Sequence, residues 1–425
     1  MPQTRHYEMK DSGVEWIGEL PSHWTTKRGK NILRLLSRPV RPDDEIVTCF
    51  RDGDVTLRKN RREEGFTNAL VEAGYQGVEP GDLVVHGMDG FAGSIGVSDS
   101  RGKASPVLNV MDSSENKRYL MYYLRGIAMR EVFLALSTGI RVRSCDLRWN
   151  KLAVLSYIVP PLSEQTAIAA YLDEKCATID AIIAEAKSSI EEYKSWKASV
   201  IFETVTKGLN PNAEMKDSGV EWIGKMPKAW KYTPLKYLAS CNDEVLTETT
   251  PEDYTFDYID IGSVHTGNGI GICERMQFKD APSRARRIVR DGDIIVSTVR
   301  TYLKAIAQVG NYDVPHIAST GFAVIRTKNA NASFLRYALL SDNFVSQVEA
   351  DSVGISYPAI NASQIMAFKI PVPSIAEQVA IASYLDARCA AIDGIIAEKE
   401  ALISDLETYK KSLIFEVVTG KRRVC

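Results

Sequence analysis

Basic side chains gather at a few places in this 425-residue chain, and each place adjoins a turn or the end of a predicted strand. The first group surrounds a Gly-Asp turn and consists of Arg51, Arg58, Lys59, Arg61 and Arg62. Arginine and lysine at such positions suit hydrogen bonds to phosphate oxygens and to the edges of bases. We therefore predict that this group contacts DNA. The alternative is a solvated surface on which Glu63 and Glu64 neutralise the charge.

Two further places in the first half of the chain are candidates for the same contact. Arg141 and Arg143 lie after Gly139 and before the last predicted strand. Because arginine is the usual reader of guanine, a base contact is expected there. His86 begins a glycine-rich stretch, residues 86–90, that follows a predicted strand. Such a stretch could approach a duplex closely, and a purely structural turn accounts for it equally well.

The second half of the chain has its own candidates, which do not repeat those of the first. They are Arg284, Arg286, Arg287, Arg300, Tyr302, Lys304 and Tyr357. Residues 300–304 follow a predicted strand end and are expected to form a DNA-facing loop. An exposed helix face remains the alternative for residues 284–290. Tyr357 occupies a segment that parallels the one containing Arg141.

Motifs for catalysis or for a cofactor are missing from the sequence. It contains no Walker A motif and no Asn/Asp-Pro-Pro-aromatic run of the kind that amino-methyltransferases carry. The glycines of residues 267–271 lack the spacing of a dinucleotide site. Seven cysteines and five histidines are scattered without the spacing of metal ligands. We expect a non-catalytic protein with no cofactor and no metal site.

Charge and hydropathy indicate the cellular compartment of the protein more clearly than its binding partner. The net charge of −2 does not by itself indicate a nucleic-acid binder, although a neutral protein can still carry a basic face. The sequence has neither an apolar run long enough for a membrane span nor a secretory signal. The scattered cysteines favour a reducing compartment, so a cytoplasmic protein is predicted.

A long duplicated segment must position these candidates. Residues 163–208 recur without a gap from residue 376, so that Leu172 matches Leu385, 213 residues later. In both copies apolar residues alternate in steps of four and three over about four heptads, which predicts a coiled-coil helix. The predicted core positions are Leu172, Cys176, Ile179, Ile183, Ile190, Leu385, Cys389, Ile392, Ile396, Ile403 and Leu406. Lys197 and Lys410 interrupt the seam at equivalent positions, where a charge can fix the register.

The duplication extends to the whole chain. Residues 9–18 recur letter for letter as residues 215–224, and Trp16 and Trp222 of this motif are predicted to anchor the helix ends. Each half thus contains the motif, a globular module and a long helix. The predicted boundaries are 1–158 for the first module with its motif, 159–208 for the first helix, 209–371 for the second module with its motif and 372–425 for the second helix.

The two modules barely match in sequence. Gly81-Asp82 and Gly292-Asp293 nevertheless each precede an apolar strand, so a shared α+β fold is predicted. Helices of about 45 residues span roughly 65–70 Å, and their matching seams predict an antiparallel, pseudo-twofold pair with a module at each end. Such an object suits duplex DNA. Since the modules differ, the target would be asymmetric and bipartite, with a spacing set by the helices.

Several motifs together carry a family resemblance. The DSGVEWIG motif, the Pro-Pro-Leu-Ser-Glu-Gln run at residues 160–165, its variant at 371–378 and the helix that follows resemble the specificity subunit of type I restriction-modification systems. The resemblance covers essentially the whole chain. It implies two target recognition domains, each reading half of a bipartite site in double-stranded DNA, and helices that dock two methyltransferase subunits. Restriction/translocase subunits would join the complex, and the specificity subunit itself would have no catalysis.

Two other functions remain open at this point. The chain could be a coiled-coil adaptor that binds two proteins and no DNA, or a self-sufficient methyltransferase.

Overall fold

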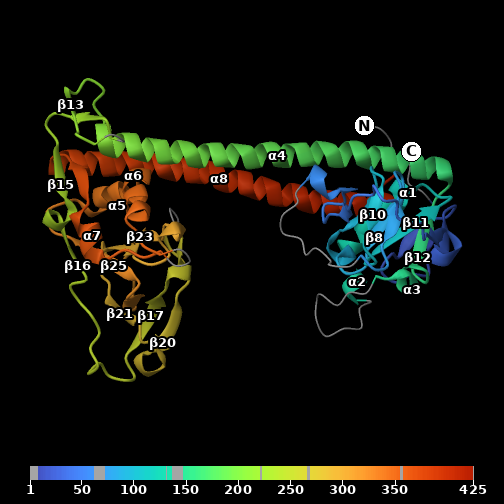
Figure 1. Ribbon diagram of the computed structural model, residues 1–425, viewed down its shortest axis with the longest axis horizontal. Coiled ribbons are helices and arrows are strands. Elements are labelled where there is room, and N and C mark those ends of the chain that lie inside the picture. The colour runs from blue at the N-terminus through green and yellow to red at the C-terminus, as the bar shows by residue number, and fades with distance from the viewer. Residues whose placement is uncertain are drawn as a thin grey trace. The chain divides into compact units, whose positions relative to one another are not determined.

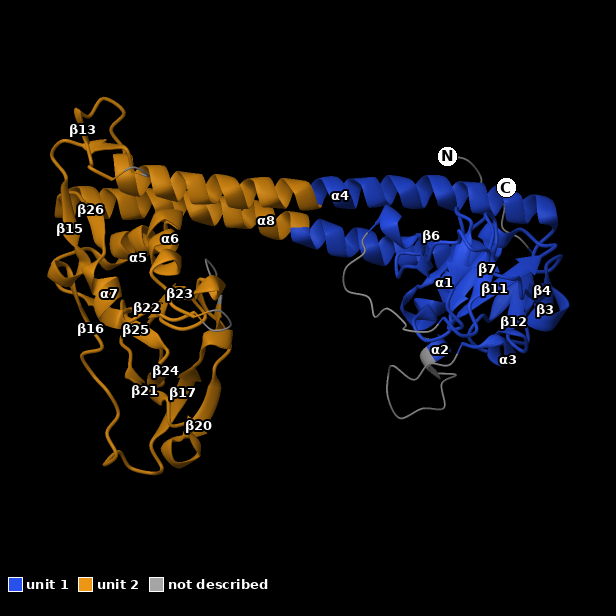
Figure 2. Cartoon of the chain, viewed as in Figure 1, with its two compact units in different colours: residues 1–186, 400–425 blue, residues 187–399 orange. Residues whose placement is uncertain are grey.

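The computed structural model describes residues 8–61, 72–130, 132–135, 147–220, 223–265, 269–354 and 358–424. The chain divides into two compact units, which are described separately. Unit 1 comprises residues 1–186 and 400–425, and unit 2 comprises residues 187–399 (Figure 2). Each unit contains one globular module and a segment of both long helices. Unit 1 therefore combines two separate stretches of sequence, whereas unit 2 is continuous.

The two long helices are α4 (Leu162–Lys207) and α8 (Ile375–Val418), which lie side by side within each unit (Figure 1). The α4 positions Leu172, Cys176, Ile179, Ile183 and Ile190 are buried, as are Leu385, Cys389 and Ile392 on α8. Ile396, Ile403 and Leu406 are partly buried. The predicted fold class, with two α+β modules and an antiparallel helix pair, is confirmed.

The two lysines in the seam each have a carboxylate partner on the opposite helix. In unit 2, Lys197 Nζ lies 2.7 Å from both carboxylate oxygens of Asp393. In unit 1, Lys410 Nζ lies 2.6 Å from both oxygens of Asp180. The two pairs are copies of each other, because each residue of the second lies 213 positions from its counterpart. They fix the antiparallel register while the lysine stems cover the seam.

A charge swap tests this register. Lys197→Asp faces Asp393 with a like charge and is expected to lower the free energy of unfolding by about 1 kcal/mol, since the pair is partly exposed. Adding Asp393→Lys should restore most of the loss in urea unfolding. The control adds Asp405→Lys instead, which changes the net charge identically at an exposed α8 residue that lies twelve positions from Asp393. Equal rescue by both second substitutions would show that overall charge, not pairing, is responsible.

Each module contains a four-stranded sheet, and the two sheets have the same strand order and the same pattern of connections. In unit 1 the strands β4 (Leu33–Leu35), β11 (Leu108–Ser113), β8 (Leu83–His86) and β9 (Ile95–Val97) form an antiparallel sheet in this order. In unit 2 the strands β16 (Ala239–Cys241), β25 (Phe322–Thr327), β22 (Ile294–Ser297) and β23 (Ile306–Gln308) repeat that order. The modules therefore have a common framework despite their different sequences.

Smaller strand pairs also repeat. The hairpin motif consists of β1 (Met9–Asp11) and β2 (Glu19–Pro21) in unit 1 and of β13 (Met215–Asp217) and β14 (Lys225–Pro227) in unit 2. The strand before each long helix pairs with the strand after the hairpin, namely β12 (Ser156–Val159) with β3 (Thr25–Arg28) and β26 (Lys369–Val372) with β15 (Lys231–Pro234).

The modules differ in their remaining strands. Unit 1 has two separate pairs, β5 (Val47–Cys49) with β6 (Val55–Leu57) and β7 (Gln76–Val78) with β10 (Gly102–Ala104). Unit 2 has a second four-stranded sheet, ordered β20 (Glu274–Gln277), β17 (Thr255–Ile259), β24 (His316–Ser319) and β21 (Ala285–Ile288), in which β17 and β24 are parallel. It also has the pair β18 (Val264–His265) and β19 (Gly269–Ile270).

Short helices complete each module. Unit 1 contains α1 (Lys117–Ala128), α2 (Val132–Ala135) and α3 (Trp149–Leu152), and unit 2 contains α5 (Ala332–Leu340), α6 (Asp342–Ala350) and α7 (Ala362–Ala367). Helices α1 and α5 begin at the N-cap residues Asn116 and Asn331, whose side chains accept backbone amides of the first turn.

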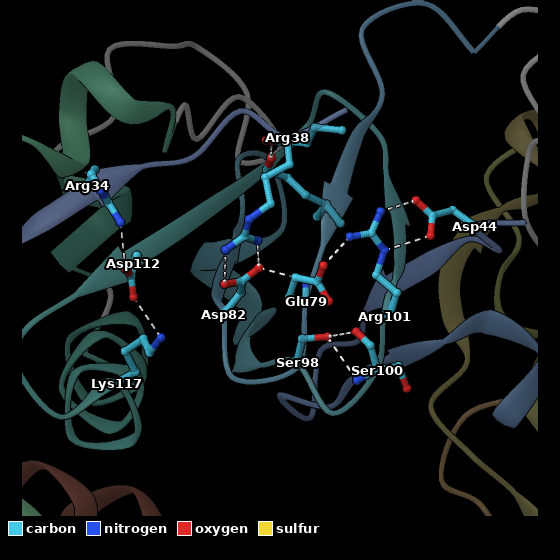
Figure 3. A network of polar contacts seen from close by, with 12 residues as sticks. Arg34, Arg38, Asp44, Glu79, Asp82, Ser98, Ser100, Arg101, Asp112 and Lys117 are labelled. Carbon is cyan, nitrogen blue, oxygen red and sulfur yellow. Dashed lines mark hydrogen bonds and ion pairs between the residues drawn. The ribbon is translucent and has the colours of Figure 1, made fainter. Parts of the chain in front are cut away.

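The Gly-Asp turns have the same construction in both units. Gly81 and Gly292 have φ of 87° and 82°, a backbone conformation that favours glycine. Asp82 accepts the backbone N–H of Glu79 at 2.8 Å and also binds the Arg38 guanidinium (Figure 3). Asp293 accepts the N–H of Arg290 at 2.8 Å and pairs with the Arg326 guanidinium. In each unit, the turn therefore leads into a strand of the four-stranded sheet and is held by a buried carboxylate.

The Glu-Gln pair at the start of each long helix joins the helix to its module. Glu164 accepts the indole N–H of Trp24 at 2.9 Å, and Glu377 accepts that of Trp230 at 3.4 Å. Trp24 and Trp230 are fully buried, whereas Trp16 is partly exposed. The tryptophans that anchor the helix starts are thus the ones following the duplicated motif. Trp16 packs against the edge of the unit 1 core, and Trp222 lies outside the described residues.

Candidate nucleic-acid interface

Four of the predicted DNA contacts in unit 1 converge on one pocket. Arg51, Arg58, Arg61 and His86 line a cavity of about 930 Å³, together with Phe50, Asp52, Asp89, Ser94 and residues of β5. They come from the β5–β6 hairpin, from the 3-10 helix η2 (Arg58–Asn60) and from the end of β8. Lys59 instead pairs with Glu45 at 2.6 Å and is not among the residues that line this pocket.

The arginines of this pocket are held by neighbouring side chains. Arg51 Nη2 lies 3.3 Å from Asp89 Oδ1, and Arg61 Nη1 lies 2.6 Å from Asp52 Oδ2. The Arg61 guanidinium also lies over the Phe50 ring, 4.5 Å from its centroid. Such contacts orient a guanidinium while leaving several of its five N–H groups for a ligand.

His86 has a defined tautomer. Its Nδ1 accepts the backbone N–H of Asp89 at 2.9 Å and that of Met88 at 3.2 Å. Burial lowers the pKa of His86, the Asp89 carboxylate opposes this shift, and Arg51 adds to it. Because Nδ1 is an acceptor and the ring is neutral at pH 7, the proton resides on Nε2.

The candidates in unit 2 occupy two places. Arg286 and Arg287 lie on β21, and Arg284 directly precedes it. The Arg286 guanidinium lies 4.9 Å from the centroid of the Phe278 ring and 3.6 Å from Glu248. The alternative of a helix over residues 284–290 is therefore wrong. This segment pairs with the buried strand β24, whose hydrogen bonds require an extended backbone.

The second place is the loop after β22. Arg300 and Lys304 both have φ of 51° and flank the 3-10 helix η8 (Thr301–Leu303). This left-handed conformation costs non-glycine residues free energy and is concentrated at functional sites. Thr301 is buried and its hydroxyl lies 2.9 Å from that of Ser352, whereas Tyr302 is exposed. The loop is therefore anchored through its buried residue and presents Tyr302 to solvent.

A single turn connects the two places in unit 2. Thr320 donates its N–H to the carbonyl of Arg284 at 2.8 Å, and Thr298 donates its N–H to the carbonyl of Gly321 at 2.8 Å. The β24–β25 turn thus binds both the strand of the arginines and the loop that leads to Arg300.

The loop that follows β8 at His86 and the loop that contains Arg300 after β22 occupy equivalent positions in the four-stranded sheets of the two units. Each connects the third strand to the fourth, from β8 to β9 and from β22 to β23. A segment preceding the last strand closes each loop, since Leu147 N–H binds the carbonyl of Gly87 and Ile360 N–H binds that of Thr298, both at 2.8 Å. The two loops are therefore equivalent in position but differ in their side chains.

Some predicted contacts cannot be located. Arg62, Arg141, Arg143 and Tyr357 lie outside the described residues. Sequence reasoning also overlooked Phe50, Asp52 and Asp89, which shape the unit 1 pocket. Only their proximity in space identifies them, because none stands out by type.

Two negative observations concern the described ranges alone. Within them, no three or more His, Cys, Asp or Glu side chains are arranged to hold a metal ion. None of the helices there combines the length and the apolar character that crossing a bilayer requires.

Comparisons with known proteins agree with this arrangement. Residues 227–404 match the family described as the type I restriction modification DNA specificity domain. The chain is 24% identical over 341 residues to the type I restriction enzyme MjaVIII specificity subunit of Methanocaldococcus jannaschii, covering 76% of each protein. It is also 24% identical to the putative MjaX specificity subunit of that organism, covering 96% of each.

Solved structures share the fold. One, from work on complex assembly and conformational transition of the type I R-M system, has a TM-score of 0.68 at 13% identity and covers 95% of this chain and 99% of its own. The HsdS subunit from Thermoanaerobacter tengcongensis has a TM-score of 0.50 at 14% identity, covering 95% and 98%. The family match over residues 227–404, the relatives that span most of the chain and the duplicated architecture all indicate a specificity subunit of a type I restriction-modification system.

Proposed function

We propose that this chain reads an asymmetric, bipartite site in double-stranded DNA, one half with each module, and docks two methyltransferase subunits through α4 and α8. Restriction/translocase subunits join through the complex, and the chain itself is non-catalytic and acts in the cytoplasm. The observation that carries the proposal is the pair of equivalent loops, one on the four-stranded sheet of each module. Their side chains differ completely, with His86 in one and Arg300, Tyr302 and Lys304 in the other.

The duplicated framework supports different roles for the modules and for the long helices. Side chains that join the modules to the helices recur in both units, as the pairs of Glu164 with Trp24 and Glu377 with Trp230 illustrate. Side chains around the loops do not recur. We therefore assign recognition to residues 1–158 and 209–371, and the spacing of the half-sites and subunit docking to residues 159–208 and 372–425.

A module exchange tests the proposal. Residues 25–155 are replaced by the equivalent module of a relative with a different target, and the methylated positions are mapped in a genome that expresses the assembled complex. We expect one half of the recognised sequence to change while the other half and the spacer stay the same. An unchanged sequence would contradict the proposal, and exchange of the second module should alter only the other half.

Salt dependence separates this function from that of a coiled-coil adaptor. Neutralising phosphates releases counterions, so the affinity of the assembled complex for a target duplex should fall steeply between 50 and 200 mM salt, by about a thousandfold or more if six or more phosphates are contacted. Absence of DNA binding, with subunit binding intact, would favour the adaptor. Methyl transfer by the purified chain alone would instead indicate a self-sufficient methyltransferase.

A further inference from the structure

We propose that His86 reads the major-groove edge of a guanine in the half-site bound by the first module. The inference rests on the proposed function and names a specificity-determining side chain and the base it selects. It comes from the position of the imidazole in the unit 1 pocket and from the polar groups that surround it.

The hydrogen bonds of the His86 ring have a defined direction. Because the Nδ1 atom of His86 accepts two backbone N–H groups of its own loop, Nε2 carries the proton. Nε2 has no hydrogen-bond partner among the described residues. The side chain is partly buried and lines the pocket, so its N–H can bind only a ligand or water.

The carboxylates of the pocket have cationic partners. The pocket contains two carboxylates, and each faces a guanidinium: Asp89 faces Arg51, and Asp52 faces Arg61. Arg58 adds a third guanidinium, with its Nε 3.3 Å from Thr48 Oγ1. The Nε2–H of His86 therefore lies in a pocket whose carboxylates are paired with the guanidinium groups of Arg51 and Arg61.

Donor groups in the pocket discriminate between the bases. In the major groove, guanine presents two acceptors, N7 and O6, whereas adenine presents an acceptor beside an amino donor. The N–H groups of His86 and of the neighbouring guanidinium groups match the two acceptors of guanine and would oppose the amino group of adenine. The unit 1 pocket therefore selects guanine.

The second module lacks this feature. The last residue of β22 is Ser297, at the place that His86 occupies at the end of β8. Ser297 is buried, and its hydroxyl donates to the carbonyl of Val299 at 2.5 Å. The inference therefore concerns one half-site only, and the other half-site serves as an internal control.

Two substitutions separate reading from a structural role. In His86→Asn, the amide oxygen can replace Nδ1 as the acceptor for the loop, but no donor reaches the position of Nε2. In His86→Gln, the amide nitrogen reaches that position as a donor, while the acceptor for the loop is lost. A structural role predicts that asparagine preserves binding, and a reading role predicts that glutamine does.

The measurement is competition binding by the complex assembled with its methyltransferase subunits, on the duplex identified by methylation mapping. Each guanine is replaced in turn by 7-deazaguanine, which lacks N7, or by 6-thioguanine, which weakens the O6 acceptor. One guanine of the first half-site should show a loss of about tenfold in the wild type and in His86→Gln. His86→Asn should bind the unmodified duplex about tenfold more weakly and be insensitive to that analogue.

Several outcomes would overturn the inference while DNA binding persists. They are wild-type affinity in His86→Asn, a sensitive guanine that remains sensitive in that variant, or the same loss at the second half-site. Replacing single phosphates by methylphosphonates provides a further arm. If His86→Asn abolishes sensitivity to one methylphosphonate and not to a guanine analogue, His86 binds a phosphate. Failure of the wild-type complex to bind any duplex would overturn the proposed function itself.

Discussion

Replacing Asp293 with alanine is expected to lower the free energy of unfolding of unit 2 by about 3 kcal/mol. The carboxylate is buried, accepts the backbone N–H of Arg290 and binds the Arg326 guanidinium through both oxygens, at 2.9 and 2.7 Å. Its removal leaves a partly buried cation with Glu244 as its remaining carboxylate partner, and it deprives the Arg290 N–H of its side-chain acceptor. Breaking a buried pair costs more than the pair contributes, because the surviving charge stays desolvated.

Urea unfolding measures this effect, and a neighbouring residue provides the control. Asp291 lies two positions away in the same turn and is exposed, so Asp291→Ala should change the free energy of unfolding by less than about 0.5 kcal/mol. Asp293→Asn retains an acceptor and should give an intermediate loss. Equal unfolding midpoints for the two alanine variants would show that the carboxylate does not hold the turn.

The duplication and the helix seam could be predicted from sequence because both are local patterns. A fixed offset needs no knowledge of the fold, and a seam of Leu172, Cys176 and Ile179 reflects the periodicity of a single helix. The pairing of Lys197 with Asp393 could not be derived in this way. It depends on the register between two helices, which the lysine alone does not specify.

The arginine-rich strand β21 illustrates a different limit. Residues 284–290 alternate too weakly to distinguish an exposed helix from a strand. The outcome is decided by β24, which pairs with β21 and buries Ala285. Tertiary pairing of this kind overrides local preference. A shift in register interrupts the pairing between Ala285 and Arg287, and such an irregularity has no signal in the sequence.

The sequence singles out four residues of the unit 1 pocket as DNA-contact candidates but does not predict the pocket itself. Arg51, Arg58 and Arg61 were singled out for their density, and His86 for its glycine-rich surroundings. Their convergence on one cavity depends on tertiary packing of the separate β5–β6 pair against β8, where Cys49 Sγ lies 4.0 Å from the carbonyl oxygen of Val84. The side chains that orient them, such as Asp89, could be recognised only in three dimensions.

Gln378 follows Glu377, which anchors α8 to its module, and its replacement is the second substitution with a large expected effect on stability. Replacing Gln378 with leucine is expected to destabilise unit 2 by about 2–3 kcal/mol. The side chain is fully buried; its Oε1 accepts the N–H of Asn331 at 2.8 Å and its Nε2 donates to the carbonyl of Pro373 at 3.0 Å. Leucine fills a similar volume but leaves both backbone groups without these partners. Because Asn331 caps α5, the substitution should loosen the link between helix and module.

Hydrogen exchange locates this effect. The amide of Asn331 should lose protection in Gln378→Leu, while amides in the middle of α8 should exchange as in the wild type. Val379→Ala is the matched control, because Val379 is the next residue on the same helix and is exposed. A larger loss of stability is expected at Gln165, the equivalent glutamine in unit 1. Gln165 also donates to Glu115 Oε2 at 2.7 Å, a charge-assisted bond, so Gln165→Leu should be the more destabilising substitution. A protected Asn331 amide in Gln378→Leu would mean that the helix is joined to its module mainly by the apolar contacts around Trp230.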